Sequence, residues 1–168
     1  MNKTSINHTS SIINHAFTMI ELLVVISIIG ILAGLATISF TNSQKQARDS
    51  ARKSDLRQYA TAVEAFANKN NGLFPGYNNA SGVQASAGLC TTLAMTACPE
   101  DAKYPNDNTF SYRYQSDGSV ATGAAVATRY VLWGKLEGTT DYWVACSNGK
   151  VGKRAQSGFG VSTGTCPI

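Results

Sequence analysis

The first pattern along the chain is a long apolar run that follows a polar N-terminus. Residues 22–40 form 19 consecutive positions without a charged side chain, and most of them are Ile, Leu, Val or Ala. At about 1.5 Å of rise per residue, a helix of this length spans roughly 28 Å, close to the hydrocarbon core of about 30 Å. The run is apolar on all sides, and it predicts a membrane-spanning helix.

The helical pattern continues beyond this run in a different form. Residues 41–60 contain no Gly or Pro, and apolar side chains recur at spacings of three to five residues. Asn70, Asn71 and Gly72 favour the end of a helix, and Pro75 prevents its resumption. We therefore expect one helix over residues 17–70, whose second half packs on a globular domain. The apolar stripe that would do so comprises Ala47, Ala51, Leu56, Tyr59, Val63 and Phe66.

From residue 110 onwards the period changes to two. Phe110, Tyr112 and Tyr114 alternate with polar residues, and residues 130–136 and 142–146 are further apolar segments bounded by turn sequences. Residues 76–108 form a long irregular segment rich in Asn, Ser, Gly and Ala. The pattern predicts an α+β fold, in which the long helix packs on an antiparallel sheet of three to four strands.

One acidic residue, Glu21, stands at the start of the apolar run. A carboxylate near hydrocarbon costs on the order of 2.5–3.5 kcal/mol and needs a partner. A secretory signal is normally cut after an apolar core of about 7–15 residues, whereas here a small residue, Ala16, precedes the run. A cut between Ala16 and Phe17 would keep the helix and create an α-amino group that can pair with Glu21 of a neighbouring chain.

The sequence Ala-Phe-Thr-Met-Ile-Glu-Leu-Leu-Val-Val at residues 16–25 resembles the class III signal sequence of type IV pilins and type II secretion pseudopilins. The resemblance implies cleavage before Phe17 by a prepilin peptidase, N-methylation of Phe17, and a role for Glu21 in recruiting and registering subunits in a helical filament. Asn-Gly-Leu-Phe-Pro at residues 71–75 resembles the end of the helix in these proteins. The resemblance therefore covers about residues 16–75 and implies the pilin fold.

On this interpretation the chain has four parts. Residues 1–16 are a cytoplasmic leader that is cleaved, and residues 17–40 are the transmembrane and filament-core half of the helix. Residues 41–72 are its amphipathic half, and residues 73–168 are a globular head. The expected location is the bacterial cytoplasmic membrane, crossed once with the C-terminus outside, and then an extracellular or periplasmic filament.

The distribution of positive charge favours the opposite orientation. The positive-inside rule places the more cationic flank of a span in the cytoplasm. The leader carries only Lys3, whereas the far side of the span carries Lys45, Arg48, Arg52, Lys53 and Arg57. The leader motif and the cysteines favour export of the head.

Composition restricts the chemistry of the exported part. Charged residues make up 14% of the chain, and its net charge is +4. Both histidines, His8 and His15, lie in the predicted leader, so the mature chain has no histidine for a Ser-His-Asp site, a Cys-His site or a histidine-containing zinc site. We expect no catalytic residue, no metal and no cofactor, and a membrane-anchored enzyme that uses carboxylates is the alternative from another class.

Four cysteines in an exported domain predict two disulfides, for which three connectivities exist. Proximity along the chain favours Cys90 with Cys98 and Cys146 with Cys166. The second pair resembles the disulfide-bounded terminal loop of many type IV pilins. A four-cysteine zinc site is the rival interpretation, but spacings of seven and nineteen intervening residues differ from the short pairs of zinc ribbons.

The charged residues of the head are interpreted mainly as solvated. Its loop carboxylates can bind calcium, as a loop of major pseudopilins does, but solvated turn residues are the favoured interpretation. The basic cluster of residues 45–57 is expected to be a solvated helix face, partly neutralised by Asp49 and Asp55, with contact to DNA or to anionic lipid headgroups as the alternative. The loop carboxylates are Asp101, Asp107, Asp117, Glu137 and Asp141.

These features together predict a structural subunit of a type IV pilus-like filament. A pseudopilin of a type II secretion system and a DNA-uptake pilin remain alternatives, because both would share the N-terminal features. The expected partners are the prepilin peptidase and methyltransferase, further pilin subunits and an inner-membrane assembly platform. Membrane lipid is the expected partner before assembly, and DNA is a partner only in the DNA-uptake alternative.

Overall fold

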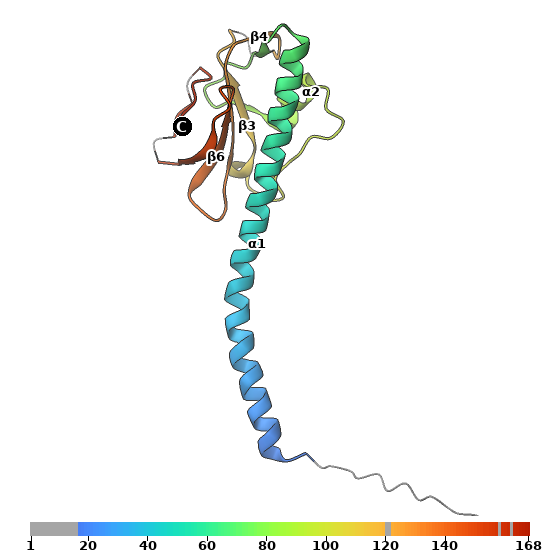
Figure 1. Cartoon of the computed structure of the whole chain (residues 1–168), viewed down its shortest axis with the longest axis vertical. Helices are drawn as coiled ribbons and strands as arrows, with labels where there is room; N and C mark the ends of the chain where they lie inside the picture. Colours follow the sequence, from blue (N-terminus) through green and yellow to red (C-terminus); the bar gives the residue numbers. More distant parts are fainter. Residues whose placement is uncertain (1–16, 120–121, 158, 162) are drawn as a thin grey trace, which may run out of the picture. The chain divides into compact units, whose positions relative to one another are not determined.

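The structure of the chain is a computed structural model that describes residues 17–119, 122–157, 159–161 and 163–168, without the side chains of residues 36–39 (Figure 1). The predicted leader, residues 1–16, lies outside this description. The described residues form two compact units, one that ends at Phe40 and one over Thr41–Ile168. One helix, α1 (Met19–Lys69), contributes its first part to one unit and its remainder to the other.

Local interactions set both ends of α1. Thr18 caps the start of the helix through hydrogen bonds with Glu21. At the other end, Asn71 and Gly72 take left-handed φ angles of 55° and 80°, and the Gly72 N–H donates to the Ala67 carbonyl at 2.8 Å. This bond satisfies a carbonyl that the helix leaves open, as in a Schellman motif. The predicted helix over residues 17–70 is therefore confirmed to within two residues at each end.

In the first unit, the apolar side chains of the helix are exposed. Every large apolar side chain described between Phe17 and Phe40 is at least 47% exposed. By length and composition this segment can cross a membrane. The surface that it presents is therefore apolar and uncovered within one copy of the chain.

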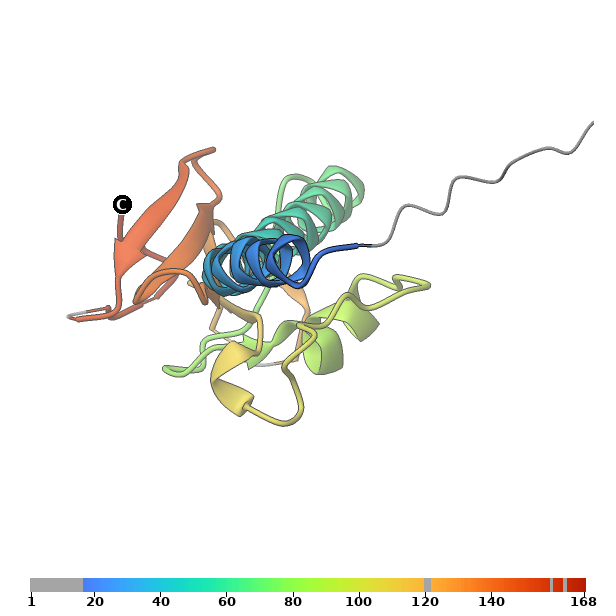
Figure 2. The same cartoon turned by 90° about the horizontal axis from the view of Figure 1, so that it is seen from below.

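The second unit contains two antiparallel sheets. In the five-stranded sheet, β5 (Tyr130–Lys135) is central and pairs with β3 (Arg113–Ser116) and β6 (Asp141–Cys146). The outer strands are β2 (Val83–Gln84) and β7 (Val151–Ala155). Strands β1 (Phe74–Pro75) and β4 (Ala125–Ala127) form the two-stranded sheet. Figure 2 shows the orange and red strands β6 and β7 on one side of the second, teal and green part of α1.

The predicted α+β fold is confirmed, but the expected count of three to four strands is too low for the larger sheet. Strand β2 has only two residues, and it lies in the segment that the sequence predicts to be irregular. Strand β7 is mostly exposed and has no apolar alternation, because it is an edge strand. The irregular segment also contains three short helical turns, η1 (Ala85–Leu89), α2 (Cys90–Thr92) and η2 (Asn108–Phe110).

The core of the head lies between the second part of α1 and the sheet. Leu56, Tyr59 and Val63 are completely buried, as the apolar stripe predicts. Ala47 and Ala51 are exposed, however, so the predicted stripe is wrong in its first two turns. The buried positions there belong to Asp49 and Arg52, which continue the same helix face at spacings of three and four residues. The buried face of α1 therefore begins with charged side chains rather than apolar ones. The core residues of the sheet side include Tyr112, Tyr114, Tyr130 and Leu132.

Candidate functional site

The start of α1 is organised by a reciprocal pair of side chains. The Thr18 N–H and the Thr18 hydroxyl both donate to Glu21 Oε2, at 2.9 and 2.6 Å. The Glu21 N–H in turn approaches Thr18 Oγ1 at 3.3 Å. This is a capping box, which satisfies N–H groups that the first helical turn leaves open. It holds the Glu21 carboxylate at the helix N-terminus, where the helix dipole favours negative charge.

The helix surface that follows Glu21 exposes few polar groups. The Ser27 hydroxyl donates to the Leu23 carbonyl at 2.8 Å, so its hydrogen bond is made within the helix. A Cβ atom placed on Gly30 or Gly34 meets no atom within 4 Å, leaving room beside the helix. A carboxylate at the helix start and an open apolar face behind it make this segment suited to packing against other helices.

Comparison with known proteins identifies this arrangement. Residues 13–37, which include Phe17, Glu21 and most of the apolar run, match the prokaryotic N-terminal methylation motif. The chain is 30% identical over 133 residues to the type IV major pilin protein PilA of Myxococcus xanthus (strain DK1622), a match that covers 72% of this chain. The chain is a type IV pilin-like protein. The matched region spans 60% of the length of that pilin.

The fold of the pilin-like chain agrees with this likeness. A long N-terminal helix with an apolar first part precedes antiparallel sheets, which is an α+β pilin-like fold. Phe17 is described and exposed, at the entry to α1. Ala16, the predicted residue before the cleavage site, lies outside the described residues.

A cluster of buried charges lies within the second unit of the pilin-like chain, between α1 and loops of the head. We call it the Arg52 cluster, and Arg52 is its centre with 1% of its surface exposed. The Arg52 guanidinium forms a two-pronged contact with Asp101, in which Nε donates to Oδ2 and Nη2 donates to Oδ1 at 3.0 Å. Its Nη1 donates to Asp49 Oδ1 at 2.7 Å. The complete cluster comprises Arg48, Asp49 and Arg52 of α1, Asp101 and Lys103 of the loop after Cys98, and Glu137 of the β5–β6 turn.

Glu137 is the second centre of the Arg52 cluster. Arg48 donates two hydrogen bonds to its carboxylate, at 2.7 and 2.8 Å, and Lys103 Nζ lies 2.8 Å from Oε1. The Phe110 ring completes the surroundings, since Arg52 and Lys103 approach its centroid to 4.6 and 5.2 Å. Such cation–π contacts are favourable where the cation is shielded from water.

The Arg52 cluster corrects two sequence-based expectations. Asp101 and Glu137 are not solvated turn residues, and Asp49 and Arg52 are not part of a solvated helix face. Each of the four has a buried side chain with charged partners. The signal that sequence analysis missed is the spacing of Asp49, Arg52 and Leu56, which places two charged residues on the buried face of the helix.

The other three loop carboxylates have local roles. Asp107 accepts hydrogen bonds from the Thr109 N–H and hydroxyl at 2.9 and 2.7 Å and so caps η2. Asp117 binds the N–H groups of Thr128 and Arg129. Asp141 begins β6. Among the residues that the structure describes, no group of three or more His, Cys, Asp or Glu side chains is placed to hold a metal ion.

Hydrogen bonds and burial shift the pKa values of this cluster in definite directions. Hydrogen bonds from Arg48, together with Lys103, lower the pKa of Glu137 to about 2. Burial disfavours the charged form of Asp49, but the N–H groups of Glu137 and Gly138 and the Arg52 guanidinium outweigh it and lower its pKa. Burial raises the pKa of nearby Asp55, against a hydrogen bond of 2.7 Å from the Tyr112 hydroxyl.

Acid is expected to weaken the head as the pH falls from about 4.5 to about 2. The pKa of Glu137 is about 2 in the folded chain against 4.5 for an ordinary glutamate. Its contribution to the free energy of unfolding is therefore fully present above pH 4.5 and lost as the pH falls through 2. A lowering of this size corresponds to roughly 3 kcal/mol for a side chain that is 8% exposed. Urea unfolding of the chain in detergent at pH 6, 4, 3 and 2 measures the loss.

The control for the acid experiment is a second carboxylate. Glu137→Gln should reduce the pH dependence in this window and leave the part that Asp49 supplies, whereas Glu100→Gln, at an exposed position of the same loop as Asp101, should leave it unchanged. An unchanged pH dependence in Glu137→Gln would show that the paired carboxylate does not control acid stability.

The disulfides join Cys90 to Cys98 and Cys146 to Cys166, with Cα–Cα distances of 5.7 and 5.6 Å. These are the two pairs that proximity along the chain favours. All four cysteines are described, and none is free. The first bridge ties α2 to the loop that carries Asp101, and the second ties the C-terminal segment to β6.

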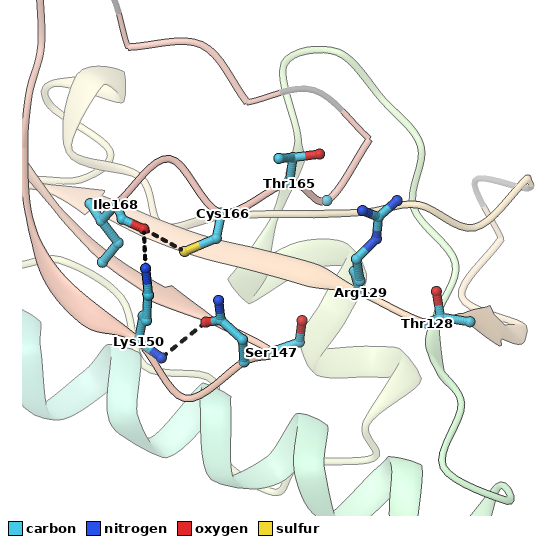
Figure 3. A pocket seen from close by; sticks show the side chains of 9 residues that line it. Thr128, Arg129, Ser147, Lys150, Thr165, Cys166 and Ile168 are labelled. Atoms are coloured by element: carbon cyan, nitrogen blue, oxygen red, sulfur yellow. Dashed lines mark hydrogen bonds between the residues drawn. The ribbon is translucent and has the colours of Figure 1, made fainter.

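A polar hollow of about 510 Å³ lies beside the second disulfide (Figure 3). Its two cationic side chains already have partners within the head. Lys150 Nζ donates to the Ile168 carbonyl at 3.3 Å, and Arg129 Nε lies 3.3 Å from Asp117 Oδ2. Arg129 is thus paired with a carboxylate, and Lys150 is held by a backbone carbonyl.

Proposed function

We propose that this pilin-like chain is the structural subunit of a type IV pilus-like filament. It is inserted in the cytoplasmic membrane, cut between Ala16 and Phe17 by a prepilin peptidase, N-methylated at Phe17, and polymerised through the first part of α1. The observation that carries the proposal is the uncovered apolar surface of that part, which coincides with the match to the methylation motif. The proposed division is residues 1–16 as leader, 17–40 as membrane and filament-core segment, 41–72 as amphipathic helix and 73–168 as head.

The exposed apolar face of the first part of α1 explains why this part needs lipid before assembly and neighbouring helices after it. Apolar side chains that are about half or more exposed are unfavourable in water, so this segment requires lipid or other helices around it. Lipid tails are as apolar as the side chains, so association of helices within the membrane depends on close packing and polar contacts. The open space beside Gly30 and Gly34 supports such packing.

Glu21 supplies the polar contact in this proposal. Hydrogen bonds from Thr18 to Oε2 hold the carboxylate in place. Cleavage before Phe17 creates a cationic α-amino group, and a neighbouring subunit displaced along the filament axis can bring this group to Glu21. A charge pair in such a low-dielectric setting is strong, and it sets one register between the helices.

The comparison favours the pilus among the machines that use such subunits. The relative from M. xanthus is named a type IV major pilin. The proposed partners are therefore the prepilin peptidase and methyltransferase, copies of the same chain and an inner-membrane assembly platform. The proposed location is the cytoplasmic membrane, with the head outside, followed by a filament at the cell surface.

Intact mass of the native protein tests the proposal. We expect a chain that begins at Phe17 and carries one added methyl group of about 14 Da. Ala16→Leu, which places a bulky residue before the cut, should retain the leader and remain in the membrane fraction without filaments. A native mass that includes Met1, or a chain that begins beyond Phe40, would contradict the proposal.

A further inference from the structure

The cationic side chains in the basic segment of α1 differ in their surroundings. Residues 45–57 carry five cationic side chains. Arg48 and Arg52 are paired within the Arg52 cluster. Lys53 instead faces a groove of about 390 Å³ between α1, the β5–β6 turn and β7, which we call the lysine groove. Its lining residues are Gln46, Asp49, Ser50 and Lys53 of α1, Leu136, Gly138 and Thr139 of the turn, and Lys153 of β7.

Two lysine side chains line the lysine groove from different elements. Lys53 Nζ lies 4.8 Å from the centroid of the Trp143 ring. Lys153 is directly opposite Trp143 in the β6–β7 pairing, so both side chains lie on the same face of the sheet. Among the described residues, neither lysine forms an ion pair. The groove therefore receives positive charge that the head does not neutralise.

The carboxylate in the lining does not cancel this charge. Asp49 Oδ1 accepts from Arg52 Nη1 and from the Glu137 N–H, each at 2.7 Å, and Oδ2 accepts from the Gly138 N–H at 2.8 Å. The Gln46 amide and the Thr139 hydroxyl add uncharged hydrogen-bond donors. Two lysines without a carboxylate partner, beside neutral donors, form a site for an oxyanion such as phosphate, because charge-assisted hydrogen bonds to phosphate oxygens are strong.

The position of the groove along the chain favours a lipid as the source of the phosphate. Gln46 follows Phe40, the last residue of the apolar run, by six residues. Six residues reach at most about 21 Å even when fully extended. In a subunit inserted in a membrane, the chain itself therefore keeps the groove near the lipid headgroups. Duplex DNA has no such tether, and its binding depends on many phosphate contacts rather than two.

We propose that the lysine groove binds the phosphate of an anionic phospholipid headgroup while the subunit resides in the membrane. This inference rests on the proposed membrane insertion, and it adds a specific lipid contact to the head. Lys53 and Lys153 hold the phosphate from its two sides, and Gln46 and Thr139 donate hydrogen bonds to its oxygens.

The test uses the full chain in a non-ionic detergent. Short-chain phosphatidylglycerol is titrated while tryptophan fluorescence is followed, because Trp143 adjoins Lys53. Short-chain phosphatidylcholine, inorganic phosphate and a short DNA duplex are the other probes. Each lysine near an anionic headgroup contributes about fivefold in affinity, so Lys53→Gln with Lys153→Gln should weaken phosphatidylglycerol binding by roughly 25-fold.

The matched control removes the same charge elsewhere. Lys69→Gln with Lys150→Gln, at two exposed positions outside the groove, should bind phosphatidylglycerol within about twofold of the unaltered chain. Equal weakening in both double variants, inorganic phosphate binding as tightly as phosphatidylglycerol, or DNA displacing the lipid in a Lys53- and Lys153-dependent way would each overturn the proposal. If filaments form and intact mass is as expected while lipid binding fails, only the lipid site is refuted.

Discussion

Replacing Glu21 by alanine is expected to leave the chain processed and membrane-resident but unable to form filaments. In the proposed filament, the change leaves the α-amino group of a neighbouring subunit without its anionic partner in a water-poor core. An unpaired buried charge of this kind costs on the order of 3–5 kcal/mol, more than a hundredfold in the equilibrium for each added subunit. Filaments sheared from cells and counted by electron microscopy, with immunoblots of the membrane fraction, measure the effect.

Two further variants separate the charge of Glu21 from its part in the capping box. Glu21→Gln keeps an oxygen that can accept from the Thr18 N–H and hydroxyl, but it removes the charge, and it should also fail to assemble. Thr18→Val removes the hydroxyl that bonds to Glu21. It should cost about 1 kcal/mol at the helix start and still assemble. Normal filaments from Glu21→Gln would mean that the carboxylate is needed only as a cap.

Replacing Arg52 by alanine is expected to lower the free energy of unfolding of the head by about 3–5 kcal/mol. Arg52 is 1% exposed and binds both Asp49 and Asp101. Its removal leaves two buried carboxylates without the guanidinium that compensates their lost hydration. Urea unfolding of the full chain in detergent at pH 7, followed by near-ultraviolet circular dichroism, measures the change.

Neighbouring arginines provide the controls for this prediction. Arg57→Ala, on an exposed position of the same helix, should change stability by about 0.5 kcal/mol or less. Arg48→Ala should fall between the two, because its side chain is 33% exposed and Glu137 keeps Lys103 as a partner. A loss in Arg52→Ala no larger than that in Arg57→Ala would show that the buried charges contribute no net stability.

The Arg52 cluster also bears on how the head is attached to its helix. Its ion pairs join α1 to segments 49 and 85 residues away in the sequence. A buried charge is tolerated only where its particular partners meet it, whereas apolar side chains accept many neighbours. The cluster therefore favours one register between the helix and the head.

The sequence by itself was sufficient for the long helix and for the likeness to pilins. The apolar run and the glycine end are signals between residues close together in the chain, and such signals do not depend on tertiary contacts. The alternation around Tyr112 and Tyr114 likewise identified an antiparallel sheet. The sequence did not predict the edge strand β7, because a strand that buries little of its surface needs no alternation of apolar and polar residues.

Only the tertiary structure decided which charged residues are buried. In the sequence, the spacing from Leu56 places Arg52 on the buried helix face, but it does not identify the charged partner that makes this burial possible. Asp101 and Asp107 look alike, since each is a charged residue in a polar segment. What distinguishes them is whether a partner from a distant part of the chain lies within hydrogen-bonding distance. Arg52 meets Asp101 across 49 residues, and the burial of both follows from that contact because neither charge is stable in the core alone. Local pattern cannot encode such a pairing, since it arises when the loop after Cys98 and the β5–β6 turn fold against the same helix face.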